Sequence, residues 1–116
     1  MFKILGLRFG KKGKAFDISK DEALKLLESD NTIVLDVRTP KEIIAVPSLV
    51  EDAITIDYED KNFENEIKKL DRNKTYLAVC TRGNYARGAC ITMKKNGFKS
   101  IKSLKGGLNA FNSCST

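Results

Sequence analysis

The sequence contains no histidine among its 116 residues. Without an imidazole base, the chain is neither a Cys-His protease nor a Ser-His-Asp hydrolase, and it has no histidine ligand for a metal ion. Any chemistry that it performs therefore depends on a thiolate, on carboxylates, on arginines and on backbone dipoles.

Long apolar runs and closely spaced cysteines are also missing. No run approaches the ~20 apolar residues of a membrane-spanning helix, and the short apolar start lacks a secretory cleavage pattern, so we expect a cytoplasmic protein that does not bind membranes. The three cysteines, Cys80, Cys90 and Cys114, are odd in number and far apart. Their spacing argues against a disulfide framework and against a Cys-x-x-Cys site, and we expect no metal and no cofactor.

Acidic side chains are absent after Asp71. Residues 1–14 carry five basic and no acidic side chains, 15–71 carry seven basic and fifteen acidic ones, and 72–116 carry nine basic ones, which gives a net charge of +6. The part of the chain that holds Cys80 is thus positive, a field that favours a thiolate and attracts small anions. A solvated basic face is the alternative. No nucleic-acid partner is expected, because no recognition helix or RNP-type motif is present.

Strand and helix patterns alternate along the chain. Its length and its 41% hydrophobic content indicate one globular domain, which we place at 15–116 after a basic arm at 1–14. Apolar runs predict strands at 15–18, 33–35, 53–56, 75–80 and 101–104. Caps and apolar spacing predict helices at 20–29, at 40–46, at 63–70, between Gly83 and the Asn96-Gly97 cap, and after Gly107. This alternation predicts an α/β domain with helices on both faces of a parallel sheet.

One stretch, from Thr75 to Arg87, predicts a functional site. An apolar run ends on Cys80, a Gly-Asn loop follows, and small residues at helical spacing begin at once. In such a strand, loop and helix, backbone N–H groups converge at the positive end of the helix and hold an anion. With Arg82 and Arg87 close in sequence, the thiolate is favoured, and we interpret Cys80 as a nucleophile. The alternative is a small apolar residue that closes a buried strand.

The other two cysteines have simpler interpretations. Cys90 falls on the apolar stripe of the helix that follows Cys80, so we interpret it as a core residue. Cys114 lies in a polar tail, where it is either an exposed thiol without function or a thiol that resolves an oxidised or persulfidated Cys80.

Three motifs, in order and with their spacing, make the chain from about residue 16 to 112 resemble the rhodanese family of single-domain sulfurtransferases. The motifs are Leu35-Asp36-Val37-Arg38-Thr39-Pro40-Lys41-Glu42, then Val79-Cys80-Thr81-Arg82-Gly83-Asn84, and finally Leu104-Lys105-Gly106-Gly107-Leu108-Asn109-Ala110-Phe111. The resemblance implies a three-layer α/β/α fold with a central, mostly parallel sheet of about five strands.

The resemblance also implies sulfur transfer. A thiosulfate or persulfide donor would leave its outer sulfur on Cys80 as a persulfide, and a thiol or cyanide would remove it. We expect a monomer that takes sulfur from a small anionic donor and passes it to a thiol acceptor. The acceptors considered include a protein. The loop residues expected to hold the sulfur are Thr81, Arg82, Gly83, Asn84, Tyr85 and Ala86. The supporting residues are Asp36, Arg38, Glu42, Arg87, Gly106 and Gly107. Asp36 and Arg38 are expected to form an orienting ion pair or loop-supporting hydrogen bonds, or else to cap a strand end.

Two other functions compete with this one. Cysteine phosphatases and arsenate reductases need Cys-x5-Arg, but Ala86 stands at that position and Arg87 follows one residue later. A non-catalytic rhodanese-like binding module commonly loses the cysteine, which this chain keeps. The family often has arginine one and five residues after the cysteine, where this chain has Thr81 and Tyr85. We therefore expect thiosulfate not to be the preferred donor.

Overall fold

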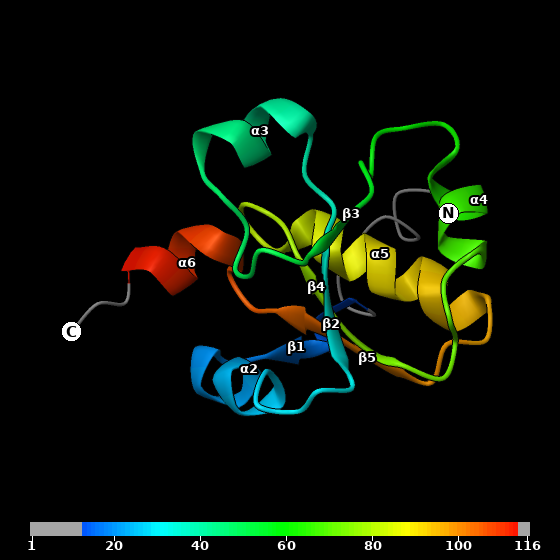
Figure 1. The fold of residues 1–116 in the computed structure, drawn as a ribbon, viewed down its shortest axis with the longest axis horizontal. Coiled ribbons are helices and arrows are strands. Elements are labelled where there is room, and N and C mark those ends of the chain that lie inside the picture. Colours follow the sequence, from blue (N-terminus) through cyan, green and yellow to red (C-terminus); the bar gives the residue numbers. More distant parts are fainter. Residues whose placement is uncertain (1–12, 114–116) are drawn as a thin grey trace, which may run out of the picture.

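The fold is built on a five-stranded sheet in the order β1-β5-β4-β2-β3, in which every neighbouring pair is parallel (Figure 1). The computed structural model describes residues 13–113. The strands are β1 Asp17–Ile18, β2 Thr32–Asp36, β3 Ile54–Thr55, β4 Thr75–Val79 and β5 Ser100–Leu104. The predicted α/β fold with a parallel sheet of about five strands is confirmed.

Helices lie on both faces of the sheet and make three layers (Figure 1). The helices are α2 Lys20–Leu26, α3 Pro40–Ala45, α4 Phe63–Lys68, α5 Asn84–Lys95 and α6 Gly107–Ser113. Helices α4 and α5 contribute to one buried cluster, and α2 and α6 contribute to a second one across the sheet. Helix α3 follows β2 and lies beyond the ends of the strands (Figure 1). It therefore borders the carboxyl edge of the sheet.

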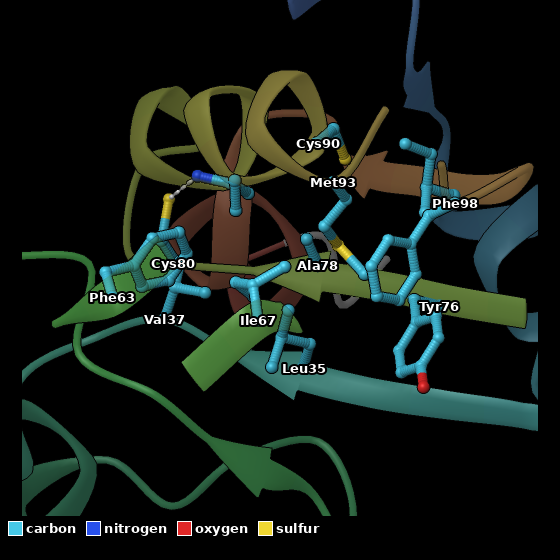
Figure 2. Packing of buried hydrophobic residues seen from close by; sticks show 13 residues of the cluster. Leu35, Val37, Phe63, Ile67, Tyr76, Ala78, Cys80, Cys90, Met93 and Phe98 are labelled. Atoms are coloured by element: carbon cyan, nitrogen blue, oxygen red, sulfur yellow. Dashed lines mark hydrogen bonds between the residues drawn. The ribbon is translucent and has the colours of Figure 1, made fainter. Parts of the chain in front are cut away.

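The central strand β4 separates these two clusters because successive side chains point to opposite faces. Tyr76, Ala78 and Cys80 pack on the α4 and α5 side, as Figure 2 shows, whereas Leu77 and Val79 pack on the other. All five side chains are at most 2% exposed. Cys80 therefore continues the buried row of β4 and reaches the carboxyl edge of the sheet on the α5 side.

The predicted helix ends at 29 and 70 are too late. Helix α2 ends at Leu26 and α4 at Lys68, and each is followed by a tighter turn in which N–H groups bond three residues back, such as Leu70 N–H to the Ile67 carbonyl. Thr32 also donates its hydroxyl to the Leu26 carbonyl at 2.8 Å, which fixes the end of α2. Apolar spacing continues through these turns, because Leu70 still packs on the core. The strands predicted at 15–18 and 53–56 are two residues long in the structure.

The predicted caps are present. Ser19 and Glu22 form a capping box at α2, and Thr39 caps α3 with Pro40 in its first turn. At the end of α5, Gly97 has a φ of 90°, and the Phe98 N–H bonds to the Met93 carbonyl at 3.0 Å. This is the left-handed glycine cap expected from Asn96-Gly97.

Parts of the predicted organisation lie outside the described residues, namely residues 1–12 of the basic arm and Cys114. Gly13 is the first described residue, and it is buried at a position where a Cβ would overlap the Arg87 side chain. Within the described residues, no helix has the length and apolar character needed to cross a membrane.

Candidate functional site

The sulfur of Cys80 lies at the start of helix α5 and accepts two backbone hydrogen bonds. The donors are the N–H groups of Gly83 at 3.0 Å and of Ala86 at 3.3 Å, and the dashed line at Cys80 in Figure 2 marks the second of these bonds. Ala86 belongs to the first turn of α5, where N–H groups have no partner within the helix. Cys80 is 2% exposed. The segment 80–86, called the Cys80 loop below, is therefore arranged to hold negative charge on sulfur, as expected at a helix N-terminus.

The backbone conformation of the Cys80 loop and its packing require glycine at two positions. Gly83 caps α5 with a φ of 99°, a backbone conformation that side chains rarely adopt. Gly107, with a φ of 67°, lies so close to the Cys80 and Thr81 carbonyls that a Cβ would overlap them. The N–H groups of Leu108 and Asn109 donate to those same two carbonyls at 2.8 and 3.0 Å. The Gly106-Gly107 turn thus packs against the backbone of the Cys80 loop.

Two side chains of the loop are tied to carboxylates outside it. The Thr81 hydroxyl donates to Glu42 Oε2 at 2.8 Å, and the Tyr85 hydroxyl donates to Glu59 Oε2 at 2.7 Å. Arg82, by contrast, is exposed, and none of the described residues accepts a hydrogen bond from its guanidinium. Asn84 is exposed as well, and its side chain makes no hydrogen bond to any residue from 13 to 113.

The first predicted motif forms a connected network that reaches the loop. Buried Arg38 donates to both carboxylate oxygens of buried Asp36, with the shortest bond at 2.8 Å, and to the Glu42 carbonyl at 3.3 Å. Glu42 also accepts from the Thr39 N–H, which is the main cause of its lowered pKa, and from Thr81. Glu42 is therefore the member of this network whose side chain bonds to the loop, and Arg38 links Asp36 to the Glu42 backbone.

Arg87, expected beside the thiol, is held by an acidic partner. Its guanidinium donates to both oxygens of Asp17 on β1, with the shorter Nη2 bond at 2.6 Å, and Ser103 on β5 donates to the same carboxylate at 2.8 Å. The hydrogen bonds to Asp17 raise the pKa of Arg87, burial opposes this effect, and the charge of Asp17 adds to it. Arg87 thus joins α5 to the β1 edge, and most of its charge is compensated.

The sequence patterns do not identify several residues that contact the site. Glu59 is one, together with Tyr58, whose ring centroid lies 5.0 Å from that of Tyr85. Asp17 is another. All lie far from the Cys80 loop in sequence, and no local pattern marks them. The only available signal was the position of the 57–62 segment after a predicted strand, since the carboxyl ends of parallel strands share an edge.

An open groove of about 510 Å³ runs beside the loop between α3 and α6. Thr81 and Glu42 line it, but the Cys80 side chain does not. The remaining lining residues are Arg38, Ala45, Val46, Leu108, Asn109, Asn112 and Ser113.

Cys90 lies in the buried cluster on the α5 side and is inaccessible to solvent, which confirms it as a core residue. Burial raises the pKa of its thiol to about 12. Among residues 13–113, no three histidine, cysteine or acidic side chains gather in a way that would hold a metal ion.

Comparison with known proteins assigns a family to this architecture. The chain matches the family model of the rhodanese-like domain over residues 19–114. It is 28% identical over 86 residues to a tRNA sulfurtransferase of Haemophilus ducreyi, and the matched region covers 74% of this chain and 18% of that protein. It is 32% identical over 99 residues to a tRNA uridine(34) hydroxylase of Cytophaga hutchinsonii, which covers 83% of this chain and 30% of that protein. The chain therefore spans less than a third of either relative.

Solved structures agree with this assignment. A rhodanese-like domain protein from Staphylococcus aureus superposes with a TM-score of 0.68 at 26% identity, covering 82% of this chain and 89% of that one. A rhodanese-related protein from Thermoplasma volcanium has the same fold, with a TM-score of 0.72 at 24% identity, covering 85% and 92%. This chain belongs to the rhodanese-like domain family.

Proposed function

We propose that this domain transfers sulfane sulfur through a persulfide on Cys80. The observation that carries the proposal is the pair of backbone N–H groups that Gly83 and Ala86 direct at Cys80 Sγ. The same donors would stabilise the terminal sulfur of a persulfide anion, which bears the charge after transfer. The tRNA sulfurtransferases among the relatives support sulfur chemistry, although they are several times longer than this chain.

Each half-reaction balances without a protein base or an added redox reagent. The Cys80 thiolate attacks the outer sulfur of the donor, a new S–S bond forms at Cys80, and the donor's S–S bond breaks with its electron pair leaving on the donor remnant, which is sulfite for thiosulfate or a thiolate for a persulfide. An acceptor thiolate or cyanide then attacks the terminal sulfur, and the electron pair returns to Cys80. The absence of histidine is no obstacle to this sequence of steps.

The contacts of Arg87 argue against the phosphatase alternative. A phosphate-binding arginine must present its guanidinium to the loop, whereas Arg87 follows the required position by one residue and donates to Asp17 instead. The supporting roles proposed for Asp36, Arg38, Glu42, Gly106 and Gly107 are to hold the loop in shape. We further propose a monomer as the active unit.

The proposal is tested by turnover with cyanide as the acceptor. The reduced domain is incubated with thiosulfate or with a low-molecular-weight persulfide, and thiocyanate is measured over time. We expect turnover with at least one donor and its loss in Cys80→Ser. If Cys80→Ser is as active as the parent protein, the sulfur does not pass through Cys80. If neither donor supports turnover, the non-catalytic binding module becomes the better account.

A further inference from the structure

Two carboxylates hold the Cys80 loop from opposite ends. Glu42 of α3 accepts from Thr81, the residue after the cysteine, and Glu59 accepts from Tyr85, five residues after it, at 2.8 and 2.7 Å. Both come from the acidic part of the chain between residues 15 and 71. The fold thus brings negative charge to a site that the charge distribution along the sequence predicted to be positive.

The nearby cations compensate this charge only in part. Arg38 is paired with Asp36 and Arg87 with Asp17, so neither brings excess positive charge to the loop. Arg82 is the one cation of the loop without a described acidic partner. Apart from Cys80 itself, the charged side chains that belong to the loop or bond to it therefore carry two negative charges, on Glu42 and Glu59, against the one positive charge of Arg82.

The pKa of the Tyr85 hydroxyl is consistent with an excess of negative charge around the loop. Its pKa is raised first by the hydrogen bond to Glu59 and then by the charge of Glu59, with smaller effects of burial and of the charges of Glu42 and Asp57. A phenol surrounded by carboxylates resists ionisation, because a further negative charge there is repelled.

We propose that Glu59 and Glu42 create a negative potential around the Cys80 loop, next to Thr81 and Tyr85. This potential selects sulfur carriers that have an ammonium or other cationic group near the sulfur, and it disfavours dianionic thiosulfate. This proposal rests on the proposed function and names the substrate class of the same site. An aminothiol or its persulfide has the required chemistry.

The charge balance of the transfer explains the selection. Attack of the Cys80 thiolate on thiosulfate brings three negative charges together beside two carboxylates, and sulfite leaves with two of them. An aminothiol persulfide carries an ammonium that offsets its own anionic sulfur, and it leaves as an aminothiolate with the same compensation. Coulomb repulsion by Glu42 and Glu59 therefore opposes the first donor more than the second.

The potential can be measured without relying on sulfur transfer. In a Cys114→Ser background, Cys80 is modified with 2-aminoethyl or 2-sulfonatoethyl methanethiosulfonate, which are reagents of opposite charge. Each forms a disulfide with the Cys80 thiolate and releases methanesulfinate. The ratio of the cationic to the anionic rate, divided by that of a free low-molecular-weight thiol, reports the sign of the potential. Low ionic strength keeps the exposed charges unscreened.

Variants separate charge from loop shape. Glu59→Gln removes the charge and keeps an acceptor oxygen, and Tyr85→Phe removes the hydrogen bond and keeps the charge. Glu66→Gln removes another exposed charge, on α4, that pairs with Lys69. We expect a normalised ratio above one, a decrease of about threefold in Glu59→Gln, and no change in the other two.

Three results would overturn the inference. One is a normalised ratio at or below one in the parent protein, another is the same ratio in Glu59→Gln and Glu66→Gln, and the third is no reaction of Cys80 with either reagent. Sulfur loading of Cys80 by any donor, measured by mass, is independent of this ratio. Loss of the charge preference with sulfur loading intact would therefore refute this inference alone, and loss of loading would refute the proposed function.

Discussion

At the scale of single residues, two buried thiols have opposite environments. Cys80 Sγ accepts two backbone N–H groups, whereas Cys90 is enclosed by the apolar cluster on the α5 side of the sheet. Burial is the largest cause of the raised pKa of Cys90. Two backbone N–H groups stabilise an anion on Cys80, whereas at Cys90 burial outweighs the opposing effects of Lys102 and Ser103.

Cys90 should resist alkylation in the folded protein. With a pKa of about 12, its thiolate fraction at pH 8 is roughly a thousandfold below that of an ordinary thiol. Iodoacetamide treatment at pH 8, followed by peptide mapping, should label Cys80 and leave Cys90 unlabelled until denaturant is added. Equal labelling of both under native conditions would contradict this environment.

Gly107→Ala should destabilise the domain more than Gly97→Ala. Both glycines have positive φ, so each alanine carries a backbone cost of about 1 kcal/mol. A Cβ at Gly97 meets no atom closer than 3.7 Å, whereas one at Gly107 overlaps the Cys80 and Thr81 carbonyls. Urea unfolding should show an additional loss of about 2 kcal/mol for Gly107→Ala. Equal losses would mean that the turn does not support the loop.

At the scale of elements, α3 is a short helix whose first turn also serves the site. Glu42 completes the capping box with Thr39 and, with its other oxygen, accepts from Thr81. A local capping pattern and a contact between residues 39 positions apart therefore share one carboxylate. The first motif thus contacts the loop through the side chain of Glu42.

Glu42 should make stability dependent on pH in the acidic range. Its pKa is lowered in the folded protein, chiefly by the Thr39 N–H and then by Thr81. The stabilisation is therefore present above the ordinary glutamate pKa of about 4.3 and is lost as pH falls through the lower folded value. Urea unfolding at several pH values should show that Glu42→Gln is less stable than the parent at pH 7 and that the difference shrinks toward pH 3. A difference that is constant with pH would contradict a charge-dependent role.

Local patterns predicted the elements better than their ends. Ser19, Thr39 and Gly97 marked caps that the structure contains, because a cap depends on residues adjacent in sequence. The ends of α2 and α4 were placed too late, because apolar residues such as Leu70 continue to face the core through a tighter turn that is no longer α-helical. Hydrophobic spacing reports which side chains are buried and does not report which carbonyl each N–H group contacts.

At the scale of the whole molecule, long-range pairs determine the charge around the site. Arg87 and Asp17 are 70 positions apart, and Tyr85 and Glu59 are 26 apart. The division of charge along the sequence placed the acidic residues away from Cys80. Parallel strands reverse this expectation, because their carboxyl ends meet at one edge and bring the acidic segments after β2 and β3 to the Cys80 loop.

Asp17 should contribute to stability by fastening the edge strand β1. Its carboxylate accepts from Arg87 of α5 and from Ser103 of β5, and Ser103 is fully buried. Asp17→Ala leaves both donors without this acceptor and should lower the free energy of unfolding by about 2 kcal/mol. Asp30→Ala, in an exposed turn, serves as the control and should change it by less than about 0.5 kcal/mol. Equal effects of the two substitutions would contradict a stabilising role of Asp17.

The most direct test of sulfur transfer is the intact mass of the reduced domain after incubation with a low-molecular-weight persulfide and then with cyanide. The account predicts a gain of one sulfur atom that maps to Cys80, its removal by cyanide, and no gain in Cys80→Ser. A parent protein that gains no sulfur, or a Cys80→Ser variant that gains as much as the parent, would contradict a persulfide on Cys80.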